Sequence, residues 1–360
     1  MSSRQPPPVH TLGASDLKVP RVVLGTMAYG TGRSEAQQVE TVRAALDAGL
    51  TALDTAPLYH FGHTETMLGE ALRGRAATVL GKVGLRWDDD ARGDVLLRTT
   101  VGGRPIVVRK DSRPQAVRAD VESSLTRLRL EALDLCQVHH PDVHTPIEDT
   151  MGALLQLRAE GKIRHIGVSN FDAEQLARAQ SALGDVPLCS HQLEFSLLHL
   201  PGRAGLEQAA NAKVGTLVYS PLHRGALTGG RSKRGGIAVA DPRARGTAFV
   251  HANAARIDAT LEAVVRPVAA RLNASIVQVV LAWVLHQPGV TAAIVGVSRP
   301  EQARDTARAA TLALEPEEVT SIERGFAALQ LDPTAEPRKR DRVERKARAV
   351  AGRLLRRLRR

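Results

Sequence analysis

The sequence is poor in the residues that stabilise small secreted domains and in segments that could cross a membrane. Of its 360 residues only two are Cys, Cys136 and Cys189, and each lies in an apolar run. This usage excludes a disulfide framework and fits a reducing compartment, so we expect a cytoplasmic protein. The longest apolar run, IVQVVLAWVLH, contains Gln278 and is too short to span a bilayer. The first residues, MSSRQPPPVH, lack an apolar stretch, so we expect no signal peptide there.

The sequence also lacks the G-x-G-x-x-G fingerprint of dinucleotide-binding doubly wound sheets, which disfavours that fold. Eight short apolar runs recur instead, with helix-like segments between them. They are continuous rather than alternating, as expected for parallel strands covered by helices. The runs are 21–26, 50–55, 77–82, 133–139, 163–169, 187–194, 214–220 and 291–298. The sequence therefore predicts an α/β fold, a (β/α)8 (TIM) barrel over residues 1–330.

The segments around these runs complete the predicted barrel. Helices are predicted over 35–48, 64–73, 114–129, 149–160, 172–183, 203–212 and 300–309, with a helical pair over 264–287. The stretch VHTLGASDLKVP, ahead of the first strand, predicts a hairpin that plugs the bottom of the barrel. Two insertions, 84–113 and 223–250, follow the third and seventh strands. Both are candidate lids or specificity loops, because barrels keep their active sites on that face; a disordered loop is an equally good interpretation of 231–247.

Most of the net charge of +11 lies at the C-terminus. Residues 338–360 contain twelve Lys or Arg and two acids, so this stretch carries +10 and the preceding 337 residues about +1. Val343, Ala347, Val350, Leu354 and Leu358 form one apolar stripe of a helix. We predict that residues 331–360 form a basic, amphipathic tail that binds an anionic membrane surface or nucleic acid. The alternative is a solvated tail with no partner.

Polar residues stand at the ends of three successive predicted strands. These are Asp54, Lys82 and His139, and Tyr59 follows in the loop after Asp54. Singly, each residue has an ordinary structural role, but the strand ends of a barrel converge on one mouth. Together they predict a proton-transfer site, in which an ammonium lowers the pKa of a phenol, a carboxylate holds the ammonium and an imidazole binds a substrate oxygen. Such a site suits protonation of the alkoxide formed when a hydride is delivered to a carbonyl.

The stretch HHPDVH raises the alternative of a metal site at His139, His140 and His144. Adjacent residues of a strand point to opposite faces, so we do not expect His139 and His140 to share an ion. We therefore predict no metal site.

At these residues the chain resembles an aldo-keto reductase, of the bacterial branch that includes general stress proteins. The resemblance runs in order over about residues 20–310, through LGTMAYG, LDTAPLYHFGHTE, LGKVGL, DLCQVHHPD, GKIRHIGVSNF, HQLEFS, YSPLHRGALTG and IVGVSRPEQ. It implies a (β/α)8 barrel that binds NADP(H), less often NAD(H), without a Rossmann fold.

The resemblance also implies a role for individual residues. Tyr59 would be the general acid, with Lys82 and Asp54 tuning it, and His139 would orient the carbonyl. The remaining implied contacts are to the cofactor: Ser169, Asn170 and Gln192 hold the nicotinamide carboxamide, Tyr219 stacks on its ring, Ser220, Leu222 and Arg224 lie in the segment that wraps the pyrophosphate, Ser298 and Arg299 meet the 2′-phosphate, and Gln302 and Thr306 lie near the adenine. Gly296 is a further residue expected to bind the cofactor.

Three positions depart from the family pattern. His140 stands where members have an aromatic residue or Arg, YHFG replaces the usual YGxG, and Thr306 replaces an Asn. The first two positions belong to the pocket wall, so the substrate class is left open.

The sequence thus predicts an NADP(H)-dependent oxidoreductase that reduces aldehyde or ketone carbonyls. One alternative is an NAD-dependent sugar or alcohol dehydrogenase on the same scaffold. Another is a regulatory subunit that binds the cofactor with little turnover, since some barrels of this family serve ion channels. The complete set of Asp54, Tyr59, Lys82 and His139 favours an enzyme.

Overall fold

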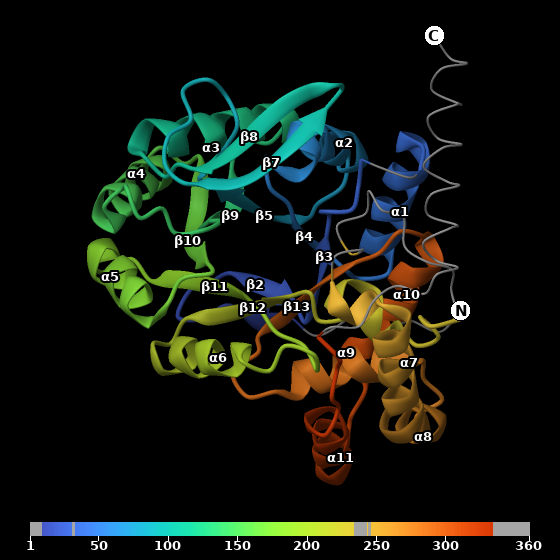
Figure 1. The fold of residues 1–360 in the computed structure, drawn as a ribbon. Coiled ribbons are helices and arrows are strands. Elements are labelled where there is room, and N and C mark those ends of the chain that lie inside the picture. The colour runs from blue at the N-terminus through green and yellow to red at the C-terminus, as the bar shows by residue number, and fades with distance from the viewer. Residues whose placement is uncertain (1–8, 31–32, 234–242, 244–245, 334–360) are drawn as a thin grey trace.

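The eight predicted strands form one closed, parallel barrel (Figure 1). The computed structural model describes residues 9–30, 33–233, 243 and 246–333. In chain order the barrel strands are β3 (Val22–Gly25), β4 (Ala52–Asp54), β5 (Thr78–Val83), β9 (Leu133–Val138), β10 (Ile163–Ser169), β11 (Leu188–Glu194), β12 (Gly215–Tyr219) and β13 (Ala292–Gly296). Neighbours in sequence are neighbours in the barrel, which closes where β13 pairs with β3. Seven of the predicted runs contain one of these strands and the eighth, 77–82, ends one residue before β5 does, so the barrel prediction is confirmed.

Helices surround the strands in Figure 1, in the positions that the sequence predicts. They are α1 (Glu35–Asp47), α2 (His63–Ala71), α3 (Pro114–Leu128), α4 (Ile147–Ala159), α5 (Ala173–Leu183), α6 (Gly202–Asn211), α8 (Arg266–Arg271), α9 (Ile276–His286) and α10 (Pro300–Arg308). The structure adds two helices that the sequence does not predict, α7 (His251–Thr260) and α11 (Pro316–Ala327). Ser34, Asp172 and Ser275 begin α1, α5 and α9 with capping boxes, which satisfy otherwise unpaired N–H groups.

The predicted plug is a two-stranded hairpin of β1 (Val9–Thr11) and β2 (Lys18–Pro20). Its buried residues Leu12, Leu17 and Val19 join an apolar cluster inside the barrel with residues from β3, β4, β5, β9, β11, β12 and β13. Gly13 permits the close fit, because a Cβ there would lie 2.5 Å from the backbone nitrogen of Gly215. The lower half of the barrel is therefore filled by hydrocarbon, which leaves the opposite end for polar residues.

The insertion at 84–113 forms an antiparallel sheet rather than an irregular loop. It consists of β6 (Leu85–Arg86), β7 (Val95–Val101) and β8 (Arg104–Lys110), in the order β6-β8-β7. Gly102 and Gly103, both with positive φ, make the two-residue turn between β7 and β8. The β7–β8 ribbon extends beyond the barrel strands near α2 and α3 (Figure 1).

The second insertion is described only in part. Short helical turns η2 (His223–Thr228) and η4 (Thr247–Phe249) lie at its two ends. Residues 234–242 and 244–245, and the predicted basic tail from residue 334 onward, lie outside the described residues. The predictions of a lid in the middle of this insertion and of an amphipathic tail helix therefore stay predictions.

No single helix among the described residues is long and apolar enough to cross a membrane. The segments His251–Arg271 and Ile276–His286 reach the length and apolar composition of a membrane span only when they are taken together, and the chain bends by 91° between them.

Candidate active site

Four polar residues meet at the carboxyl ends of three neighbouring strands. Asp54 is the last residue of β4, Lys82 lies near the end of β5, and His139 directly follows β9. These strands are hydrogen-bonded neighbours in the order β4-β5-β9. Tyr59 begins the short turn η1 (Tyr59–Gly62) after β4. The structure therefore brings the four predicted residues to one mouth of the barrel.

Asp54 and Lys82 form a buried ion pair beneath the phenol of Tyr59. The Lys82 Nζ donates to Asp54 Oδ1 at 2.6 Å, to the Tyr59 hydroxyl at 3.1 Å and to the Thr55 carbonyl at 3.3 Å. The side chains of Lys82 and Asp54 are 0% and 3% exposed. Gln192 Nε2 donates to the other carboxylate oxygen at 2.8 Å. The pair is thus well supplied with hydrogen bonds, which a buried ion pair needs if it is to avoid a large desolvation cost.

The direction of these hydrogen bonds leaves the phenol proton of Tyr59 uncommitted. An ammonium has only donors, so the Tyr59 oxygen accepts from Lys82. The O–H of Tyr59 can therefore donate to another acceptor at the mouth, such as a carbonyl oxygen.

The pKa of Tyr59 depends on more than the neighbouring ammonium that the sequence predicts. Burial raises it, Lys82 lowers it and Asp54 raises it again, and the net shift is upward. Lys82 lowers the pKa as the sequence predicts, but burial, which penalises the phenolate, outweighs it, and Asp54 offsets part of the effect of Lys82. Burial alone would lower the pKa of Lys82, but Asp54 and Tyr59 outweigh it and raise that pKa. At neutral pH the site holds a phenol and an ammonium.

His139 supplies a neutral imidazole next to this phenol. Its ring meets the Tyr59 ring edge-on, with centroids 6.0 Å apart and an interplanar angle of 83°. Burial, then Lys82 and His140, holds the pKa of His139 well below its ordinary value. Its backbone N–H donates to Val83 at 2.9 Å, which ties it to the end of β5. A neutral imidazole keeps one N–H for a substrate oxygen.

His139 and His140 do not point to opposite faces, in contrast to the expectation from strand alternation. Their rings are stacked, with centroids 5.4 Å apart and an interplanar angle of 14°. Alternation does not apply here because β9 ends at Val138. His144, the third histidine, contacts Asp94 at 2.9 Å instead. Within the described residues no group of three or more His, Cys, Asp or Glu side chains has the geometry of a metal site.

The residues predicted to hold the nicotinamide form a hydrogen-bonded chain at the same mouth. Asn170 donates to the His139 carbonyl at 2.9 Å and to Ser169 Oγ at 3.0 Å, and it accepts from the Tyr219 hydroxyl at 2.9 Å. Asn170 has a φ of 61°, an uncommon left-handed conformation for a residue other than Gly. Gln192 uses its amide N–H groups on Asp54 and, at 3.4 Å, on Gln137.

The residues predicted to bind the rest of the dinucleotide lie in the loops after β12 and β13. Ser220 and Arg224 have φ values of 55° and 54°, so their backbone turns sharply after β12. Gly296 ends β13, and Ser298 donates to Gln302 from both its backbone nitrogen, at 2.9 Å, and its hydroxyl, at 3.0 Å. Thr306 is only 3% exposed on the inner side of α10, so the structure does not bring it to the surface with the others.

These two loops carry cationic side chains of the kind that bind the phosphates of a dinucleotide. Arg224 and Arg299 are both exposed, and neither side chain has a carboxylate within 4.0 Å in the part of the chain that the structure describes. Arg299 directly precedes α10, whose N-terminus favours anions. Two such guanidinium groups on adjacent barrel loops, beside amides at the mouth, fit a nicotinamide dinucleotide.

Sequence reasoning missed an aromatic pair beside the site. Phe61 and Trp87 meet edge-on, with ring centroids 5.2 Å apart and an interplanar angle of 86°. Phe61 lies in η1 two residues after Tyr59, and Trp87 follows β6 of the insertion sheet. His60 and Phe61 both have positive φ, at 48° and 55°. Gly30 makes room for this turn, since a Cβ there would lie 2.5 Å from the His60 ring.

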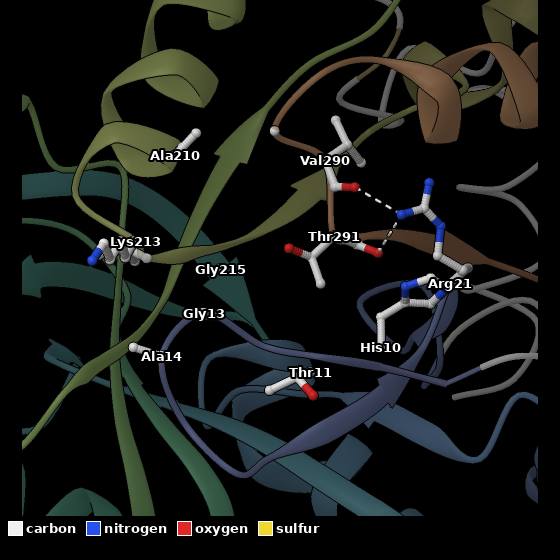
Figure 2. A pocket seen from close by; sticks show the side chains of 12 residues that line it. His10, Thr11, Gly13, Ala14, Arg21, Ala210, Lys213, Gly215, Val290 and Thr291 are labelled. Carbon is white, nitrogen blue, oxygen red and sulfur yellow. Dashed lines mark hydrogen bonds between the residues drawn. The ribbon is translucent and has the colours of Figure 1, made fainter.

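A hollow of about 580 Å³ lies at the opposite end of the barrel (Figure 2). It is lined by the hairpin plug and by the segments that precede β12 and β13. Its central Arg21 donates to the carbonyls of Val290 at 2.9 Å and Thr291 at 3.2 Å, as Figure 2 shows, and to that of Leu285. These contacts hold the bottom of the barrel together. Asp54, Tyr59, Lys82 and His139 do not line this hollow.

Comparison with known proteins agrees with the fold and identifies a family. The model of the Aldo/keto reductase family matches residues 21–325. The aldo-keto reductase YhdN of Bacillus subtilis is 32% identical over 301 residues, which are 81% of this chain and 85% of that protein. The NADH-specific methylglyoxal reductase of Escherichia coli is 30% identical, over 89% of this chain and 98% of that protein.

Among solved structures, the glycerol dehydrogenase AKR11B4 of Gluconobacter oxydans superposes with a TM-score of 0.78. It is 32% identical, over 91% of this chain and 98% of that chain. The chain therefore belongs to the aldo/keto reductase family, whose members carry out carbonyl oxidoreduction with nicotinamide cofactors.

Proposed function

We propose that this protein reduces aldehyde or ketone carbonyls with NADP(H), with Tyr59 as the general acid. The observation that carries the proposal is the buried Asp54–Lys82–Tyr59 chain, in which the phenol accepts from Lys82 and keeps its own proton. When bound, the reduced nicotinamide supplies a hydride to the carbonyl carbon. The C=O π electrons move to oxygen, and that oxygen takes the Tyr59 proton to become a hydroxyl.

The neighbouring residues support this transfer in different ways. His139 is neutral, so its N–H can hydrogen-bond the carbonyl oxygen and position it without competing as an acid. Lys82 stabilises the phenolate that forms when Tyr59 gives up its proton, because the two groups are 3.1 Å apart. Asp54 keeps Lys82 protonated and fixed. Tyr59 thus donates the proton, Lys82 stabilises the charge that forms, and His139 orients the carbonyl.

The preference for NADP(H) rests on Arg299. This exposed side chain stands before α10 without an acidic partner among the described residues, where it can pair with a 2′-phosphate. The Escherichia coli relative is named as NADH-specific, so nucleotide preference varies among similar chains. The Ser298–Arg299 pair is what favours NADP(H) in this one.

Alcohol oxidation is a second candidate, favoured by the similarity to a glycerol dehydrogenase at 32% identity. Oxidation needs the Tyr59 phenolate as a base, and the raised pKa of Tyr59 makes this form scarce at neutral pH. Reduction should therefore dominate near pH 7, and oxidation should gain as the pH rises.

Initial rates with a panel of aldehydes and ketones, each with NADPH and with NADH, test the proposal. We expect turnover of several aldehydes, with NADPH the better donor. Nucleotide binding without turnover of any carbonyl would contradict the proposal and favour a regulatory role. Turnover only of alcohols with NAD⁺ would favour the dehydrogenase.

A further inference from the structure

The insertion sheet carries a lysine to the mouth of the barrel. Lys110 is the last residue of β8 and pairs with Leu85 in β6. The next residue, Asp111, donates its N–H to the Gly84 carbonyl at 3.0 Å. Gly84 and Leu85 directly follow β5, the strand of Lys82. The backbone therefore places Lys110 just above the strand end that carries the buried ion pair.

Strand alternation turns the Lys110 side chain toward the barrel. Val108, two residues earlier on the same face of β8, is fully buried. Arg109, on the other face, donates to the Gly93 carbonyl at 2.8 Å. Lys110 is half-buried and has no carboxylate within 4.0 Å among the described residues. Asp94, whose pKa Lys110 helps to lower, is hydrogen-bonded to His144. Lys110 therefore contributes a positive charge that lies near Asp94 but forms no ion pair within 4.0 Å among the described residues.

His140 lies on the same side of the mouth. Its ring stacks on His139, and its loop is bound to the strand that continues from Lys110, because Ser112 donates its N–H to Asp142 at 3.0 Å. Burial, then the charges of Lys110 and Lys82, lowers the pKa of His140 to about 4. At neutral pH the ring is neutral and offers one N–H, while Lys110 supplies the charge. Lys82 forms an ion pair with Asp54, whereas Lys110 has no carboxylate within 4.0 Å among the described residues.

We propose that Lys110 and His140 form an anion subsite that binds a carboxylate or phosphate group on the carbonyl substrate. This proposal rests on the proposed function and adds the substrate class. An ammonium and an imidazole N–H give an anion two hydrogen bonds, one of them charge-assisted. Since His140 stacks on His139, the anionic group binds next to the imidazole that orients the carbonyl. Substrates would then be short acidic or phosphorylated aldehydes and ketones rather than neutral ones.

Two matched pairs of aldehydes test the subsite. The first pair is 4-carboxybenzaldehyde and its neutral ester methyl 4-formylbenzoate, and the second is glyceraldehyde 3-phosphate and glyceraldehyde. We expect kcat/KM of the protein to favour the anionic member of at least one pair by about tenfold, the factor that corresponds to roughly 1.4 kcal/mol. The pair with the larger ratio distinguishes a carboxylate from a phosphate.

Substitution identifies the residues responsible for this ratio. Lys110→Met, which keeps the length but removes the charge, should bring the ratio close to one. His140→Phe, which keeps a stacked ring but removes the N–H, should lower it by a smaller factor. Lys213→Met, at the opposite end of the barrel, is the matched control and should leave the ratio unchanged. A protein without preference in either pair, or a preference that survives Lys110→Met, would overturn the proposal.

A binding measurement separates this proposal from the proposed function. Isothermal titration with benzoate and with inorganic phosphate should show weaker binding of at least one anion to Lys110→Met than to the unmodified protein. Benzamide should bind both equally. This difference would support the subsite even if no aldehyde were reduced, an outcome that would contradict the proposed function alone. Equal binding of both anions to the two proteins would overturn the subsite.

Discussion

The two ends of the barrel interior differ in chemistry although the same strands build both. On β4, β5, β9 and β12, an apolar residue of the lower layer is followed two positions later by a polar residue near the mouth. The pairs are Ala52 and Asp54, Leu80 and Lys82, Leu135 and Gln137, and Leu217 and Tyr219. Residues two positions apart share one face of a strand. Each of these strands therefore points both a core residue and a polar residue of the site into the barrel.

This comparison explains how the barrel tolerates a buried ion pair. The lower layer joins the hairpin plug in one apolar cluster and excludes water from below. Lys82 and Asp54 of the upper layer lie next to this apolar cluster and are buried, so their electrostatic interaction is stronger than it would be in water. Substitutions in the upper layer should therefore affect chemistry, and those in the lower layer should affect stability.

The largest expected effect is on the chemistry of the upper layer. Tyr59→Phe removes the proton donor and leaves the ring, so turnover of aldehydes should fall roughly 10²–10⁴-fold. Nucleotide affinity, measured by fluorescence titration, should stay nearly unchanged because the phenol is not needed to hold the nucleotide. Because a general acid contributes at least about 10²-fold, retention of more than about a tenth of the turnover would show that another group is the acid.

The lower layer should respond with a loss of stability. Leu80 is fully buried in the inner cluster, and Leu80→Ala should lower the free energy of unfolding by about 2–5 kcal/mol. Urea denaturation followed by circular dichroism measures this change. Val9→Ala, at a residue of the plug that is 53% exposed, is the control and should change stability by about 0.5 kcal/mol or less. Similar losses from both variants would mean that the lower cluster is not a packed core.

The sequence predicts the barrel well because its strands are buried on both faces. Such strands appear as short, continuous apolar runs, and each of the eight runs coincides with a barrel strand to within two residues at either end. The end of each run then locates the mouth, so the amino-acid sequence alone groups Asp54, Lys82 and His139. It does not reveal the insertion sheet as readily, although VGGR between two strand-like segments is a hairpin signal.

Properties that depend on packing cannot be predicted in this way. The direction of the Tyr59 pKa shift depends on how deeply the phenol is buried, and burial depends on residues distant in sequence. The stacking of His139 on His140 depends on where β9 ends, one residue before the pair. The burial of Thr306 depends on which face α10 turns to the barrel. Residue types locate the chemistry, and tertiary packing sets its electrostatics.

A smaller effect should appear at the rim of the upper layer. Arg299→Ala removes the proposed contact to the 2′-phosphate, and a charge-assisted contact of this kind contributes about 1.5–3 kcal/mol. The affinity for NADPH should therefore fall at least about tenfold, and that for NADH should change little. Titration of both nucleotides measures the difference, with Arg308→Ala at the other end of α10 as the control. Equal affinity of the unmodified protein for the two nucleotides would refute the preference.

A pH dependence of stability is also expected, with opposite signs at the two ends. Asp120 in α3 accepts the N–H of Gly84, above β5, at 2.9 Å, and burial raises its pKa to about 7. Asp16, in the plug, contacts His165 at 2.7 Å, and this hydrogen bond lowers its pKa. A raised pKa means that Asp120 favours folding most at acidic pH, and that this contribution is lost as the pH rises toward 7.

For Asp16 the sign is reversed, since its contribution is present above its ordinary pKa and is lost as the pH falls. Urea denaturation from pH 3 to pH 8 should therefore show that Asp120→Asn removes a decline in stability toward pH 7, with a slope of at most about 1.4 kcal/mol per pH unit. Asp16→Asn should instead remove a decline toward acid that is confined to the lowest pH values. If Asp120→Asn left the profile of the unmodified protein unchanged, the carboxyl group of Asp120 would not be held in a buried, proton-binding environment in the folded protein.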